Sequence, residues 1–180
     1  MPGVIKVDTI QNSGGTEVLS FDSSGRVSIS NTIEIDMWKL SADFTSNNAT
    51  ITGWERQTFS AAGYAGTGMT HNSGVFTFPN TGLWKVEFNF RTNLESTDTS
   101  GGALIRLSTD SGSSYTNIAG AFENRNSNSS CLTQALINVT NASTFRVLFE
   151  TEAIDTGGKI SGHADRNDTN VVFHRITDSQ

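Results

Sequence analysis

Alternation of apolar and polar side chains is the dominant pattern in this chain. The run "LWKVEFNFR" (83–91) places Trp84, Val86, Phe88 and Phe90 on one side and mostly polar residues on the other. A period of two is that of a β-strand with one buried face. No window of a dozen residues combines helix-forming residues with a period of 3.6. The pattern predicts an all-β protein.

Several further runs from residue 32 onward predict strands of similar length. They are "TIEIDMWKL", "GALIRLSTD", "CLTQALINV", "STFRVLFE" and "NVVFHRI". The first run separates two sets of side chains, Ile33, Ile35 and Met37 on one side and Glu34, Asp36 and Trp38 on the other. The connections are rich in Ser, Thr, Asn and Gly, and several are long enough to be surface loops. Roughly eight strands with mixed loop lengths predict an antiparallel two-sheet sandwich of the jelly-roll type.

The first 31 residues have a different pattern of apolar and polar side chains. The short alternating runs "VIKVDTI", "EVLSFD" and "RVSIS" are separated by the turn signals "NSGG" and "DSSG". Strands this short cannot bury enough apolar surface alone, but several copies pairing around an axis could do so. We therefore predict two parts, an intertwined β segment over 1–31 and a sandwich domain over 32–180.

Composition narrows the choice of partners. Hydrophobic residues make up 35% of the 180 residues, so the core is modest and oligomer contacts are expected to add stability. The net charge is −6 and the twelve Lys and Arg residues do not cluster, which argues against nucleic acid and anionic membranes. No apolar run is long enough for membrane insertion, and "MPGVIKVDTI" lacks the apolar core of a signal peptide. We expect synthesis in a cytoplasm.

Candidate catalytic chemistry is sparse. The single cysteine, Cys131, alternates with apolar residues and is predicted to be a buried strand side chain. The histidines His71, His163 and His174 are scattered, without the spacing of metal ligands. Neither a nucleophile elbow nor a phosphate loop is present. We expect no enzymatic activity and no cofactor.

Two acidic groups leave alternatives open. The loop "DTGGKISGHADRNDTN" carries Asp155, Asp165 and Asp168, whose oxygens suit calcium, although a solvated loop without metal is the simpler interpretation. Glycoside hydrolysis needs two carboxyl groups held close together. Glu87, Glu150 and Glu152 lie on predicted strands, where solvent-facing positions are the simpler interpretation, so no metal or catalytic residue is assigned.

Three aromatic residues are candidates for contact with a receptor. Trp54, Tyr64 and Tyr115 lie in or beside predicted loops, and such side chains combine a large contact area with a polar group. Structural packing is the alternative for each of them.

The stretch "SGVFTFPNTGLWKVEFNF" resembles the central signature of the complement globular-head and tumour necrosis factor superfamily. The matching positions are Gly74, Phe76, Phe78, Pro79, Gly82, Trp84 and Phe88. The last run, "NVVFHRI", is also similar to that family's closing strand, in which a central Phe, here Phe173, packs inside. The resemblance covers about residues 33–177 and implies a jelly roll that assembles as a tight homotrimer. Core or trimer-contact positions are then expected at Phe76, Phe78, Trp84, Phe88 and Phe173.

The segment "IKVDTIQNSGGTEVLSFDSSGRVSIS" is similar to segments of structural proteins from marine tailed bacteriophages, tail fibres above all. This resemblance implies a virion protein that attaches to other virion proteins through residues 1–31. The head would then bind a glycan or protein on the host surface. A capsid decoration or a tail or neck spacer is one alternative. A cell-derived complement-like domain, which should carry a secretion signal or collagen repeat, and a glycan-acting enzyme are the others.

Overall fold

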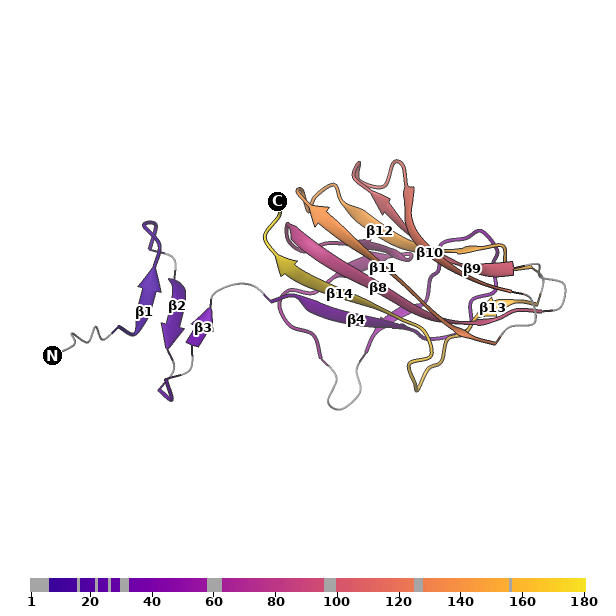
Figure 1. Cartoon of the computed structure of the whole chain (residues 1–180), viewed down its shortest axis with the longest axis horizontal. Coiled ribbons are helices and arrows are strands. Elements are labelled where there is room, and N and C mark those ends of the chain that lie inside the picture. Colours follow the sequence, from indigo (N-terminus) through magenta and orange to yellow (C-terminus); the bar gives the residue numbers. More distant parts are fainter. Residues whose placement is uncertain are drawn as a thin grey trace. The chain divides into compact units, whose positions relative to one another are not determined.

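A computed structural model describes residues 7–15, 17–21, 23–25, 27–29, 33–57, 63–95, 100–124, 128–155 and 157–180. The chain forms two compact units, Met1–Thr32 and Ile33–Gln180, shown in Figure 1. Within the described residues every regular element is a β-strand. The same residues include no helix that is long and apolar enough to cross a bilayer.

The first unit is a small antiparallel sheet with the order β1-β2-β3. Its strands are β1 (Thr9–Gln11), β2 (Glu17–Phe21) and β3 (Val27–Ile29). The side chains of Val7, Ile10 and Phe21 are exposed, and Leu19 is half-buried. None of the side chains that the structure describes in this unit is buried. The unit therefore encloses no hydrophobic core within those described side chains.

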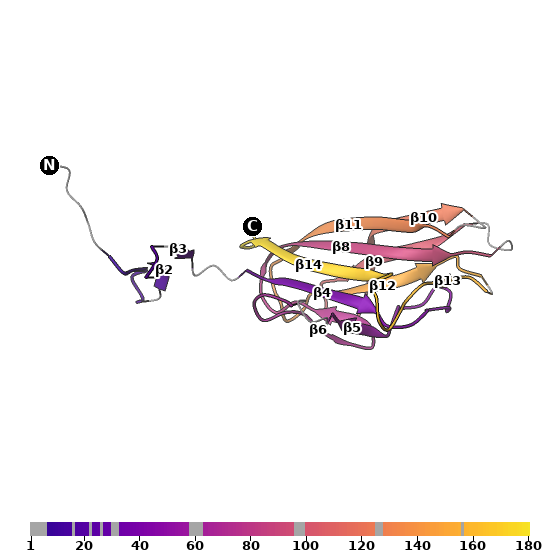
Figure 2. The same cartoon turned by 90° about the horizontal axis from the view of Figure 1, so that it is seen from below.

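The second unit is a sandwich of two antiparallel sheets, seen in two views in Figures 1 and 2. The first sheet has the order β11 (Ser130–Val139), β8 (Gly82–Asn93), β14 (Asn170–Thr177), β4 (Ile35–Leu40) and β5 (Trp54–Arg56), and β13 (Lys159–Ile160) pairs with β8. The second has the order β10 (Thr116–Asn124), β9 (Ser100–Ser108), β12 (Arg146–Glu152), β7 (Val75–Thr77) and β6 (Thr70–Asn72).

Strands that follow one another along the chain often lie in different sheets. β8 and β9, β10 and β11, and β11 and β12 each cross from one sheet to the other, whereas β9 and β10 form a hairpin. The first and last strands of the unit, β4 and β14, pair near the middle of one sheet. The predicted fold class, an all-β antiparallel jelly-roll sandwich, is confirmed.

Aromatic side chains fill the space between the sheets. β8 alternates strictly between buried and half-buried positions, with Trp84 and Phe88 directed inward. The ring centroids of Phe88 and Phe149 are 4.7 Å apart, and those of Phe76 and Phe173 are 5.0 Å apart. Such aromatic pairs contribute beyond simple area burial. The core therefore connects strands that are far apart in the sequence.

The five positions predicted for the core or the trimer contact all lie in the core of the single chain. Their exposed fractions are at most 1% within the single chain, for Phe76, Phe78, Trp84, Phe88 and Phe173. A side chain already enclosed by its own sandwich has no surface left for a neighbouring subunit.

The hairpin between β6 and β7 turns in two residues. Ser73 (φ 49°) and Gly74 (φ 83°) both have positive φ, as a tight hairpin turn of the twisted sheet requires. A Cβ atom at Gly74 would overlap the backbone carbonyl of Ile51. Glycine is therefore required here for its conformation and for its lack of a side chain.

Candidate functional site

Strand β4 faces the core with its acidic side chains. Glu34, just before the strand, and Asp36 are each only 1% exposed, whereas Ile33 is 62% and Ile35 is 39% exposed. At the start of the strand apolar side chains lie outside and carboxylates inside, which reverses the usual arrangement, whereas Trp38 and Leu40 further along the same inner side join the core. The reversal needs inward partners for the acids, and it leaves apolar residues on the surface.

Asp36 is saturated by hydrogen bonds. Its carboxylate accepts two from Arg56, at 3.0 Å from Nε and 2.9 Å from Nη2, one from Trp38 Nε1 at 2.9 Å and one from the Met69 amide at 2.8 Å. The Arg56 guanidinium also lies over the rings of Trp38 and Tyr64, at 4.5 Å and 4.3 Å from their centroids. Bidentate pairing and cation–π contact together stabilise a carboxylate in this position.

Glu34 joins two other segments of the unit. Its Oε2 accepts a hydrogen bond from the Gly68 amide at 2.9 Å, and its Oε1 accepts one from Asn80 Nδ2 at 2.7 Å. Asn80 belongs to the "PNTG" break that precedes β8. The inward acids therefore fix the loops around β4, and the opposite side of the strand is free for apolar residues.

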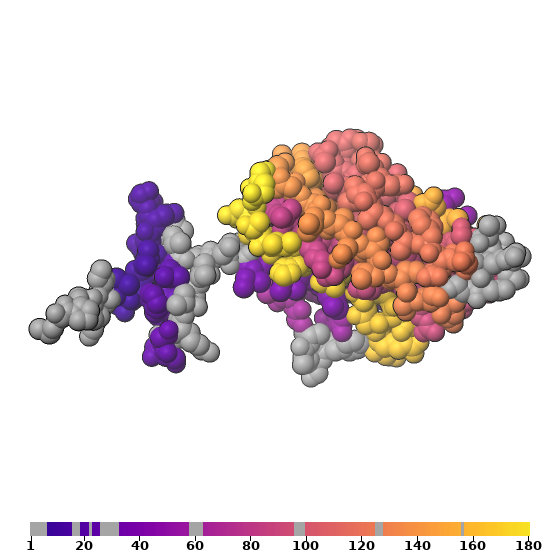
Figure 3. Space-filling view, viewed as in Figure 1, coloured from indigo at the N-terminus to yellow at the C-terminus, as the bar shows by residue number. Residues whose placement is uncertain are grey.

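Exposed apolar side chains gather on the outside of the β11-β8-β14-β4 sheet. We call this set the outer apolar face, and its members are Ile33, Ile35, Leu132, Leu136 and Ile176. Leu132 is 55% and Leu136 is 64% exposed. The strand register aligns Leu136, Lys85, His174 and Ile35 across the four strands. Orange residues of β11 and yellow residues of β14 share one face of the unit in the space-filling view (Figure 3).

The sandwich also has an open edge beside this face. β10 ends one sheet and β11 ends the other, and the two strands contact each other. Ile118 and Phe122 on β10 are exposed. An edge strand with apolar side chains invites pairing with another chain, and on the face itself the exposed Leu136 and Ile35 flank the polar side chains of Lys85 and His174. The outer apolar face and the β10–β11 edge are therefore candidates for assembly.

The aromatic residues predicted to contact a receptor have three different environments. Trp54 is 3% exposed on β5, and its Nε1 donates to the Ile51 carbonyl at 2.9 Å. Its assignment as a contact residue is therefore wrong, because the indole packs in the core. Tyr64 is exposed but stacks on Arg56. Tyr115 is half-buried, and burial raises the pKa of its phenol. The structure does not bring the three side chains together into one site.

A polar pocket of about 260 Å³ lies at one end of the sandwich. β4 and β8 both run antiparallel to β14, so the last residues of these two strands share an end of the unit with the first residues of β14. The start of β4, which Ile33 precedes, pairs with the later part of β14 toward the other end, where the carboxyl terminus lies (Figure 1). Every lining residue except one glycine has a polar side chain, the set being Asp43, Arg91, Asn93, Asn128, Lys159, Ser161, Gly162, His163, Arg166 and Asp168.

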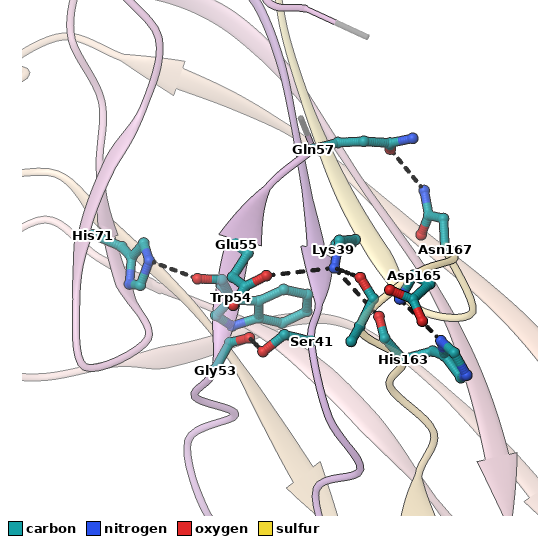
Figure 4. A network of polar contacts seen from close by, with 11 residues as sticks. Lys39, Ser41, Gly53, Trp54, Glu55, Gln57, His71, His163, Asp165 and Asn167 are labelled. Carbon is teal, nitrogen blue, oxygen red and sulfur yellow. Dashed lines mark hydrogen bonds and ion pairs between the residues drawn. The ribbon is translucent and has the colours of Figure 1, made fainter. Parts of the chain in front are cut away.

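The loop before β14 forms one wall of the pocket and is firmly tied to the sheet. The buried amine of Lys39 donates to the carbonyls of His163 at 3.3 Å and Ala164 at 2.7 Å, and also contacts Glu55 at 3.4 Å. Figure 4 shows these contacts, together with the hydrogen bond from Asn167 to Gln57. The pocket wall is therefore held in place in the free protein.

Charge in the pocket is unevenly compensated. Asp43 accepts from Lys159 Nζ at 2.7 Å, and Asp168 accepts from Arg166 at 2.7 Å and 2.9 Å. These hydrogen bonds lower the pKa of both carboxyl groups, and the charge of Arg91 lowers that of Asp168 further. Arg91 donates through Nε to Asn128 Oδ1 at 2.9 Å, but its Nη atoms bond to no residue that the structure describes. Among the described residues that line the pocket, three Arg and Lys side chains face two carboxylates.

The acidic loop predicted as a possible calcium site is part of this pocket. Asp168 is already paired with Arg166, and Asp165 is exposed. Across the described ranges no group of three or more His, Cys, Asp or Glu side chains is placed to hold a metal ion. Asp168 therefore forms an ion pair with Arg166.

The remaining chemical candidates are separated in space. Cys131 is buried, as predicted, and burial raises the pKa of its thiol to about 12, with a hydrogen bond to Glu123 adding to the effect. Glu87 pairs with Lys85 on one sheet and Glu150 with Arg106 on the other. Both acids point away from the shared core, so they cannot flank one glycosidic bond. His71 packs edge-on against Trp38 at 4.8 Å.

Sequence inspection missed both candidate sites. The outer apolar face depends on the reversal of β4, and the polar pocket depends on Arg91 and Asp43 meeting the loop before β14. The sole local signal was the cluster of charges in that loop.

Comparison with solved structures shows which known fold the chain resembles. The chain is similar to Eiger TNF from S. frugiperda, with a TM-score of 0.61 and 10% identity, over 83% of this chain and 96% of that one. It is also similar to murine APRIL, with a TM-score of 0.60 and 9% identity, over 80% of this chain and 99% of that one. No protein-family model and no curated protein sequence matches the chain. The fold is a tumour necrosis factor-like jelly roll, as the residues at 74–90 indicated.

Proposed function

We propose that the chain is a structural protein of a tailed bacteriophage virion, a homotrimeric tail fibre or fibre tip. Residues 1–31 attach it to other virion proteins, and the jelly roll is a head that binds a host-surface glycan or protein. The resemblance of residues 5–30 to phage fibre segments supports the virion assignment. Binding without turnover is the mechanism, because three heads multiply weak contacts through effective concentration.

The outer apolar face is the observation that carries the assembly. Leu132 and Leu136 protrude from an edge strand beside the exposed Ile118 and Phe122. One copy thus offers an apolar sheet face and an apolar sheet edge. A contact between the face of one copy and the edge of the next is heterologous, and such contacts form a closed ring when the rotation between copies closes. Covering this surface contributes about 25 cal/mol per Å² of apolar area.

The first unit supports assembly independently. Its described apolar side chains are exposed or half-buried, and its strands are three to five residues long. Such a sheet gains stability when equivalent sheets from other copies cover it. Both units therefore favour a multimer, and the tumour necrosis factor-like fold together with the resemblance at 74–90 favours three copies.

Sedimentation equilibrium of the purified chain tests the assembly. We expect a species near three times 19.3 kDa. Leu136→Asp places a charge on the outer apolar face and should shift the protein toward monomer. Thr70→Asp is the matched control, because Thr70 is an exposed strand residue of the opposite sheet. A stable, soluble wild-type monomer would refute the trimer.

Antibody labelling of virus particles tests the location. Label on the tail supports the fibre, whereas label spread over the capsid lattice identifies a decoration protein and label along the tail shaft or neck a spacer. Competition between the purified chain and infectious particles for host cells then tests the binding role. A chain that leaves adsorption unchanged at saturating concentration does not bind the receptor.

A further inference from the structure

We propose that the polar pocket binds the carboxylate of an acidic sugar, such as a uronic acid unit of a surface polysaccharide. This assignment rests on the proposed function, since host-surface binding is what supplies the ligand. It gives the head a specific recognition site, at the end of the sandwich opposite to Ile33. The outer apolar face is a separate surface, formed by other residues.

Arg91 is the group that recognises the charge. The two carboxylates of the pocket are matched by Lys159 and Arg166, so the Arg91 charge is the one left over. Its Nε is held by Asn128, which orients the guanidinium, and its Nη atoms meet no described partner. A planar guanidinium binds a carboxylate through two parallel hydrogen bonds. One uncompensated charge suits a monoanion better than a doubly charged phosphate.

The neighbouring groups suit a ligand rich in hydroxyls. Asn93, Asn128 and Ser161 line the pocket and offer both donors and acceptors. Ring hydroxyls of a sugar need such groups, and the described lining residues include no aliphatic side chain and no Phe, Tyr or Trp for an apolar ligand. The volume of about 260 Å³ suits a small ligand rather than a drug-sized one.

The pocket is preorganised. The Ser161 amide donates to the Arg91 carbonyl at 2.8 Å, and the Gly162 amide donates to Asp43 at 3.0 Å. Lys39 holds the next two carbonyls of the same loop. A site already in its binding geometry loses little conformational entropy on binding, which raises affinity. The whole chain has a net charge of −6. A locally positive pocket therefore attracts an anion more strongly than the rest of the surface does.

Backbone amide shifts of the full-length chain, titrated with sodium glucuronate, test the assignment. Glucose is the matched ligand, because it differs in having a hydroxymethyl group in place of the carboxylate, and inorganic phosphate is the competing anion. We expect saturable shifts of the Ser161 and Gly162 amides with glucuronate, and weaker binding of both other ligands by about tenfold or more. No saturable shift with glucuronate, or equal binding of glucose or phosphate, overturns the assignment.

Variants locate the interaction. Arg91→Gln should weaken glucuronate binding about tenfold or more, since it removes a charged hydrogen-bond donor. Arg91→Lys keeps the positive charge but loses the two parallel donors of the guanidinium, and it should bind glucuronate with intermediate affinity. This variant tests the role of Arg91 even if the glutamine variant folds poorly. Lys6→Gln removes the same charge from the first unit and should bind normally. Unchanged binding by Arg91→Lys and Arg91→Gln refutes the proposal. Sedimentation reports assembly separately, so failure of the pocket and failure of the trimer are distinguishable.

Discussion

Asp110 illustrates at the residue scale how a short loop sets the properties of one side chain. In the loop between β9 and β10 its carboxylate accepts hydrogen bonds from Ser108 Oγ at 2.7 Å, the Ser114 amide at 3.0 Å and Ser114 Oγ at 2.6 Å. These bonds favour the ionised form and lower the pKa of Asp110 to about 2, with Ser114 the largest cause. An exposed carboxylate can thus be well ordered without any cation.

The pKa of Asp110 gives a pH prediction. Because the folded state lowers this pKa, the loop's contribution to stability is present above the unfolded value of about 3.9 and is lost as the pH falls toward 2. Carboxyl carbon shifts followed by NMR should titrate with a midpoint near 2. Ser114→Ala should raise the midpoint, whereas Ser113→Ala should leave it, because Ser113 bonds to the Asp110 carbonyl. A midpoint near 4 in the wild type contradicts the loop geometry.

Cys131 gives a second residue-scale prediction. Burial on β11 raises the pKa of this thiol to about 12, and the hydrogen bond to Glu123 at 3.4 Å adds to the effect. The thiolate is the reactive form, so the folded protein should react very slowly with iodoacetamide at pH 8. The same chain in urea should be labelled quickly. Glu123→Gln should speed the native reaction modestly, and labelling of the folded wild type at the unfolded rate would disprove the buried position.

At the scale of elements, β8 and β4 show what periodicity can and cannot predict. β8 was predictable because its large apolar residues alternate with polar ones and all face one core. β4 alternates just as regularly, but its inward acids find partners elsewhere. Arg56 lies 20 residues from Asp36, and Asn80 lies 46 residues from Glu34. Long-range hydrogen bonds compensate the buried acids beside the core residues Trp38 and Leu40, and no local pattern contains these bonds.

Neither candidate site could be predicted from the sequence, because each depends on contacts between residues that are far apart along the chain. Arg91 occupies an ordinary outward position at the end of β8, and Asp43 follows β4 in a polar stretch. They meet Lys159 and Gly162 only because the ends of β4, β8 and β13 converge, so that Asp43 and Lys159 are 116 residues apart. For Trp54 the error was the opposite one. Its place after a polar loop suggested an exposed side chain, but its indole packs in the core.

The β6–β7 hairpin gives a prediction at this scale. Gly74 and Gly53 have the same φ of 83°, but a Cβ would overlap the Ile51 carbonyl at Gly74 and would meet its first neighbour at an ordinary 3.8 Å at Gly53. Gly53→Ala should therefore cost about 1–2 kcal/mol of unfolding free energy, from the left-handed conformation alone. Gly74→Ala should cost more, about 3 kcal/mol or above. Chemical denaturation measures both, and equal losses would show that the turn can move away from residue 51.

On the scale of the whole molecule, the two units have unequal means of stability. The head encloses a large aromatic core in one chain, so it does not depend on neighbours to form its interior. Its outer apolar face and the sheet of the first unit are the parts that gain from other copies. The proposed assembly would therefore act on the surface of a completed sandwich, rather than supplying missing walls of its core.

This division predicts how thermal stability depends on concentration. If three folded chains dissociate on unfolding, a tenfold rise in protein concentration stabilises each subunit by about 0.9 kcal/mol through mass action. For a chain of this length that corresponds to a Tm increase of about 2–4 °C. Leu136→Asp should lower the Tm and abolish its concentration dependence, because the exposed leucine no longer joins copies. Thr70→Asp should keep the wild-type slope. A Tm independent of concentration in the wild type would mean that the outer apolar face stays exposed in solution, and the trimeric head would have to be abandoned.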